Sequence, residues 1–112
     1  MKFEELLDYL GQNAPYDLLD GDVAATVDKA RAGNHRDPLA GEILAALIEG
    51  ADVQDLETEV DRATVVNALG PLRLKYMADD APVEGFRMVE RLIQTMDLAF
   101  NEEALRKRRT ED

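Results

Sequence analysis

Apolar residues recur along this chain at steps of three and four, in segments that glycine and proline separate. That spacing places apolar side chains on one side of a helix, whereas a half-buried strand would show alternation. No internal repeat of fixed period occurs. The pattern therefore predicts an all-α fold, a compact bundle of five or six short-to-medium helices.

The first third of the chain predicts two helices joined by a single helical turn over residues 16–19. Gly11 is expected to end the first helix, because glycine is favoured just past a helix C-terminus. Asp22 can cap a second helix over residues 23–32, which Gly33 closes. The apolar stripe of the first helix consists of Phe3, Leu6, Leu7 and Leu10.

The clearest helix start is Asp37-Pro38, a capping acid followed by proline in the first turn. The helix is expected to span about 38–49, with Gly50 just past its end. Its apolar residues cover about half of the helical circumference. They are Leu39, Ile43, Leu44, Leu47 and Ile48. Because so much of its surface is apolar, we expect this helix at the centre of the bundle.

The start and stop signals of the helices are less clear over residues 52–78. Asp52 is expected to cap a short turn, and residues 59–69 predict a helix that ends at Gly70-Pro71. Residues 72–77 alternate as a strand would, so helix and strand both remain open there. We favour a helix over residues 71–78, because a lone strand would have no partner in this chain.

The longest helix is expected over about residues 82–100. Val83, Met88 and Leu98 fall off its main apolar stripe, so a homodimer through this helix is an alternative to a monomer. We assign residues 1–105 to one domain. The polar tail, residues 106–112, either continues the helix, where its bases suit the helix dipole, or frays.

The formal net charge is −11, and its distribution along the chain is uneven. Residues 1–66 contain 15 acidic and 5 basic side chains, whereas residues 67–112 contain 9 and 8. The densest stretch contains no base, and its acids are Glu49, Asp52, Asp55, Glu57, Glu59 and Asp61. Such a surface attracts basic partners over about a Debye length, so we predict these six as partner-binding residues. Within a helix, Asp55 with Glu59 and Glu57 with Asp61 would share a face.

The sequence contains little that indicates a catalytic, phosphate-binding or metal-binding site. The chain has no cysteine and no serine, which excludes cysteine and serine nucleophiles, and its glycines form no phosphate-binding motif. Asp17, Asp20 and Asp22 crowd one turn, but no register fits a calcium-binding loop. His35 is expected to be a solvated loop residue. We therefore predict no catalytic residues, no cofactor and no metal site, and consider an enzyme less expected than a binding protein.

Nucleic acid is not an expected partner, because the basic residues over 106–109 lie at the end of a strongly acidic chain. No segment is apolar enough to span a membrane, so we expect a cytoplasmic protein. The preferred hypothesis is a small acidic helical regulator, inhibitor or adaptor that engages a basic protein surface. One alternative is a structural or housekeeping helical protein whose acidity is salt adaptation. A third is a DNA-binding or DNA-mimic protein.

Overall fold

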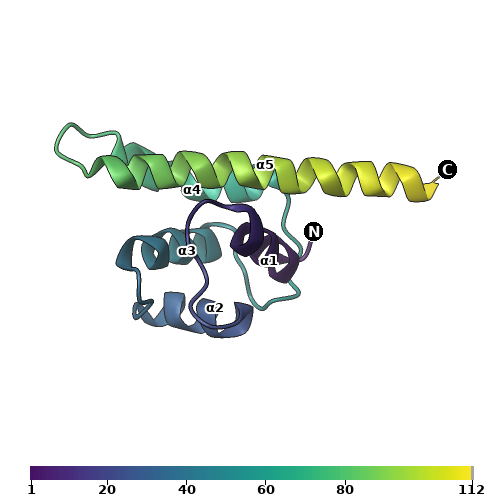
Figure 1. The fold of residues 1–112 in the computed structure, drawn as a ribbon, viewed down its shortest axis with the longest axis horizontal. Helices are drawn as coiled ribbons and strands as arrows, with labels where there is room; N and C mark the ends of the chain where they lie inside the picture. Colours follow the sequence, from purple (N-terminus) through teal and green to yellow (C-terminus); the bar gives the residue numbers. More distant parts are fainter. Residues whose placement is uncertain (112) are drawn as a thin grey trace.

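Five helices form the fold in a computed structural model that describes residues 1–111, with side chains to residue 109. Within that range they are α1 (Phe3–Asn13), α2 (Val23–Ala32), α3 (Pro38–Gly50), α4 (Arg62–Tyr76) and α5 (Val83–Glu111). The predicted all-α bundle is confirmed. Figure 1 shows α5 lying along one side of the other helices, with its C-terminal part projecting beyond them.

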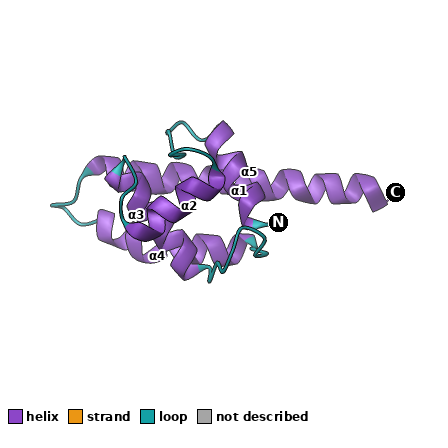
Figure 2. Cartoon of the chain, turned by 90° about the horizontal axis from the view of Figure 1, so that it is seen from below, coloured by secondary structure: helices purple, strands orange, loops and turns teal. Residues whose placement is uncertain are grey.

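The helix α3 occupies the position that its sequence predicts. It packs against α2 on one side and α4 on the other, while α5 contacts both α4 and α1. Ile43, Leu44 and Leu47 of α3 are almost completely buried. Figure 2, seen from below, shows α4 alongside α5, with α1, α2 and α3 in front of them. The apolar side chains of α3 are thus covered by neighbouring helices on opposite sides.

Aspartates begin three of the helices. The carboxylate of Asp22 accepts a hydrogen bond from the amide of Ala25, and that of Asp37 accepts from the first-turn amides of α3. Asp61 accepts from the amide of Thr64 and so caps α4. These bonds satisfy amides that have no partner within the helix. Residues 59–61 therefore precede α4, and the prediction of a helix from residue 59 is wrong.

The helix α4 runs without interruption through Gly70-Pro71, where the sequence predicts a break. Pro71 has no amide hydrogen to donate to the carbonyl of Asn67, which normally weakens a helix interior. Leu69 and Leu72 on either side are buried in the core, and this burial holds the segment helical. Residues 72–76 are accordingly helical, which settles the choice between helix and strand.

Two other boundaries differ from prediction. The helix α1 continues past Gly11 to Asn13. The side chain of Leu10 is buried in the core, and the next helical turn follows directly from it. The helix α5 begins at Val83 and continues through the basic residues to Glu111. Asp112, the last residue of the predicted tail, lies outside the described residues. Among the described helices, none combines the length and apolar character needed to cross a membrane.

Candidate functional site

The six predicted partner-binding acids lie on one connected stretch, the acidic segment, which we define as residues 49–61. It begins in the last turn of α3 and crosses to the cap of α4 mostly as loop. All six carboxylate side chains are exposed. Because residues 55–61 are not helical, the expected helical pairs of acids do not form. The acids instead alternate with less exposed residues through a turn, in which the amide of Thr58 donates to the carbonyl of Asp55, and on to buried Val60.

Backbone hydrogen bonds fix the second part of the acidic segment against the first residues of the chain. The amide of Phe3 donates to the carbonyl of Thr58 over 2.9 Å, and the amide of Glu4 donates to that of Leu56 over 2.9 Å. The amide of Val60 donates to the carbonyl of Met1 over 2.8 Å. The loop therefore presents its acids from a backbone that is held in place.

Two of the six acids are already engaged within the molecule. Glu59 lies 2.9 Å from the amino group of Met1, and this hydrogen bond lowers the pKa of the Glu59 carboxyl. The same amino group lies 3.4 Å from Glu103. The hydrogen bond from the amide of Thr64 lowers the pKa of Asp61. Glu59 and Asp61 thus have structural roles that reduce what they offer a partner.

The other four acids have no base partner among the side chains that the structure describes. Asp55 accepts a hydrogen bond from the amide of Glu57 over 2.8 Å, and Asp52 accepts one from the side-chain amide of Gln54 over 2.7 Å. Within residues 1–109, no ion pair involves Glu49, Asp52, Asp55 or Glu57. The uncompensated part of the acidic segment is therefore its first two thirds.

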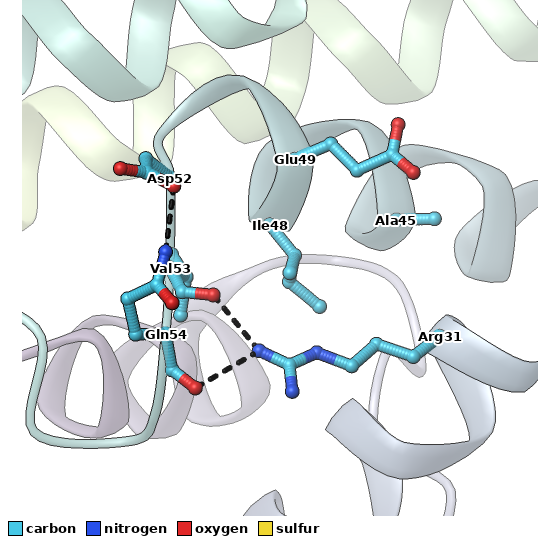
Figure 3. A pocket seen from close by; sticks show the side chains of 7 residues that line it. All are labelled: Arg31, Ala45, Ile48, Glu49, Asp52, Val53 and Gln54. Atoms are coloured by element: carbon cyan, nitrogen blue, oxygen red, sulfur yellow. Dashed lines mark hydrogen bonds between the residues drawn. The ribbon is translucent and has the colours of Figure 1, made fainter.

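A hollow of about 530 Å³ adjoins this part of the segment, between α2 and the end of α3. Figure 3 shows its lining, in which Ala45 and Ile48 are apolar and Glu49 and Asp52 are acidic. Arg31 reaches in from α2 and donates hydrogen bonds to the carbonyls of Val53, at 2.8 Å, and Gln54. In this view the carboxylate of Glu49 points away from the Arg31 guanidinium. We call this site the α2–α3 hollow.

The hollow has the chemistry to hold a long basic side chain. An aliphatic stem can lie on apolar surface while its charged head remains among carboxylates. Charge-assisted hydrogen bonds to carboxylates are stronger than neutral ones. The guanidinium of Arg31 lies on the same lining, but its hydrogen bonds to backbone carbonyls hold it against the loop. Sequence reasoning found Glu49 and Asp52 but missed Arg31, which is 22 residues away from Val53.

The prediction of a solvated His35 is wrong. The side chain is 6% exposed, and its Nε2 lies 2.8 Å from the carbonyl oxygen of Leu18. The amide of Asp37 donates to Nδ1 over 3.0 Å. With hydrogen on Nε2, the ring donates one bond and accepts the other. His35 therefore joins the loop before α2 to the start of α3, a role that its polar sequence neighbours did not indicate.

The aspartates near residue 20 also have partners within the fold. Asp20 lies 2.9 Å from the Lys29 amino group, and the hydrogen bond from that group lowers the pKa of the Asp20 carboxyl. Asp17 forms an ion pair with Arg36, and Asp22 caps α2. Within the described residues, no cluster of three or more acidic or histidine side chains is arranged to hold a metal ion.

Comparisons of this chain with protein-family models, curated proteins and solved structures gave no match. Function must therefore be inferred from the geometry of the chain itself.

Proposed function

We propose that this protein is a small acidic regulator, inhibitor or adaptor that binds a basic surface on a partner protein. One observation supports this above others: four exposed acids have no base partner among the described residues, with Glu49 in the last turn of α3 and the other three on the loop after it, which backbone hydrogen bonds to α3 and to residues 3–4 hold in place. Charges held in a fixed arrangement steer an oppositely charged partner and select its orientation. The chain's lack of cysteine suits a reducing compartment, and we propose the cytoplasm as its location.

The α2–α3 hollow gives the proposed interface a specific contact. A lysine or arginine of the partner would lie beside Ala45, with its charge directed toward the exposed carboxylates of Glu49 and Asp52 and away from the guanidinium of Arg31. Desolvated anchors of this type usually contribute more affinity than the surrounding charges. The remaining acids would act mainly on the rate of association.

The experiment compares two charge-reversed variants with equal net charge. Glu49→Lys/Glu57→Lys alters the acidic segment without removing a side-chain hydrogen bond, and Asp79→Lys/Asp80→Lys alters exposed acids between α4 and α5. Partners captured by the wild-type chain are identified, and their association rates are measured at low salt. We expect the first variant to slow association at least about tenfold, because steering by local charge is lost.

The second variant should leave the association rate close to that of the wild type. Equal slowing by both variants would mean that only overall charge matters, and it would reject the acidic segment as the binding surface. A basic partner whose rate neither variant changes would reject the proposal altogether.

Salt adaptation is the second candidate, and the distribution of acids favours it. Exposed acids also occur far from the acidic segment, on α1 at Glu4 and Asp8 and on α2 at Asp28. In a salt-adapted protein, molar salt should raise the melting temperature beyond the effect of screening self-repulsion. A melting temperature that levels off once repulsion is screened would instead favour the binding role.

A further inference from the structure

The C-terminal part of α5 leaves apolar surface uncovered. Figure 1 shows this end of the helix projecting beyond the body of the molecule. Leu98 is 57% exposed and Leu105 is 53% exposed. Residues seven apart lie on the same face of a helix, two turns from each other. Leu98 and Leu105 therefore form a short apolar stripe, more than half of which is exposed.

The same end of α5 differs in charge from the rest of the molecule. Residues 106–109 are all basic, namely Arg106, Lys107, Arg108 and Arg109. Residues 1–105, in contrast, contain 22 acidic and 9 basic side chains. The projecting end is thus complementary in charge to the body of another copy. A single chain carries both halves of a possible interface.

We propose that α5 pairs with α5 of a second copy, antiparallel and through the stripe of Leu98 and Leu105. In the register that places Leu98 opposite Leu105 of the second copy, the two-fold axis passes between residues 101 and 102. The reciprocal pair, Leu105 opposite Leu98, follows from the symmetry of such an interface. Each copy then covers the apolar stripe of the other.

This register places Arg106 opposite Asp97 of the second copy, a carboxylate that also forms an ion pair with Arg62 of its own chain. Arg109 lies opposite the neutral Gln94. The four basic residues then run alongside the body of the second copy, where acids are in excess. Charge complementarity is what favours a second copy over another partner for this stripe.

The exposed apolar residues of α5 place the proposed dimer contact nearer the C-terminus of the helix than the sequence predicts. Met88 was expected to contribute to a homodimer through residues 82–100, but it is buried in the protein's own core. The other two residues of that prediction, Val83 and Leu98, are exposed, and Leu105 adds exposed apolar surface one step beyond Leu98 on the same face. Because the stripe is small compared with stable protein interfaces, the dimer should depend on both concentration and salt.

Sedimentation equilibrium of the full chain over a wide concentration range tests the proposal. We expect reversible dimers, and we expect Leu98→Glu and Leu105→Glu each to raise the dissociation constant at least about tenfold. Leu74→Glu is the matched control, because Leu74 is 71% exposed but lies on α4. All three positions are exposed, so circular dichroism should show unchanged folding.

A cross-link tests the register. The chain has no cysteine, so Asn101→Cys introduces one thiol close to the proposed axis. Mild oxidation should link two Asn101→Cys chains, whereas Val83→Cys chains should remain unlinked. A monomer at every concentration would overturn the proposal, as would a dimer that Leu74→Glu weakens and Leu105→Glu does not. Cross-linking of Val83→Cys chains would overturn the antiparallel register.

Discussion

At the scale of single residues, His35 connects the loop before α2 to the start of α3. Its ring bonds to the carbonyl of Leu18 and to the amide of Asp37, and its Cβ lies where a side chain on Gly41 would have to fit, 2.8 Å away. The ring is therefore enclosed by the helix α3 and the loop that precedes α2. A buried polar group with both hydrogen bonds made fixes the position of its neighbours.

Replacement of His35 should measure this contribution. We expect His35→Ala to lower the free energy of unfolding by about 2–4 kcal/mol, because a buried carbonyl and an amide lose their partner and a cavity remains. Urea denaturation measures the change. Asn34→Ala, at the exposed neighbouring position, is expected to change stability by less than about 0.5 kcal/mol. Similar effects of the two substitutions would show that the His35 bonds contribute little.

Gly50 offers a second test at this scale, because α3 and α4 approach closely there. A Cβ on Gly50 would lie 2.5 Å from Cβ of Ala68 and 2.7 Å from its Cα. Gly50→Ala should therefore destabilise the protein by about 1–3 kcal/mol, since the two helices must move apart. The measurement is again urea denaturation.

Gly70→Ala is the matched control for Gly50→Ala. Gly70 lies inside α4, and a Cβ there would have no neighbour within 4 Å other than the adjacent residues. Alanine should change the stability by less than about 1 kcal/mol, because its smaller loss of backbone freedom is offset by crowding between its Cβ and the ring of Pro71, the next residue. Gly50→Ala should therefore cost more than Gly70→Ala, and a stabilising Gly50→Ala would contradict the close approach of α3 and α4.

At the scale of helices, local signals predicted α2 and α3 well. Both begin at an aspartate whose carboxylate caps the first turn, and both have their stop signal within a residue or so of the observed end. The helix α4 was predicted as two pieces, because Gly70-Pro71 is a local break signal. Burial of Leu69 and Leu72 against other helices outweighs that signal, and such packing is not visible in the local sequence.

The contact between α3 and α4 includes a polar cluster that makes stability depend on pH. The hydroxyl of Tyr76 donates a hydrogen bond to Glu42, and the Lys75 amino group lies 2.9 Å from the same carboxylate. The Tyr76 bond, and then the Lys75 bond, lower the pKa of Glu42 below its usual 4.5. A carboxyl whose pKa is lower in the folded state than in the unfolded state stabilises the fold at pH values above the unfolded pKa. This stabilisation is lost as the pH falls through the folded pKa.

Tyr76→Phe should reduce this pH dependence. We expect the free energy of unfolding of the wild type to fall more steeply in acid, below about pH 4.5, than that of the variant. Near neutral pH the variant should be less stable by about 1–2 kcal/mol, because the carboxylate loses a donor. Urea denaturation across this pH range measures both effects. Parallel pH curves for the two proteins would contradict the role of Tyr76.

At the scale of the whole molecule, the sequence predicted the acidic segment but not its surroundings. The identity and exposure of its acids follow from composition, and the structure places all six at the surface. The α2–α3 hollow needs Arg31 from another helix, and the loop needs backbone bonds from residues 1–4. Both are contacts between distant parts of the chain. The binding role of the six acids itself stays a prediction.

The pairing of residues 1–4 with residues 56–60 also has a consequence for the order of folding. Contacts between distant segments form late, because the chain between them must first be organised. The short-range turns of α2 and α3 can form early, whereas the acidic loop acquires its shape only when the two paired segments meet. In an incompletely folded chain the same charges would lie on a flexible segment, and the chain would bind the proposed partner protein poorly. Competence to bind would thus report that folding has finished.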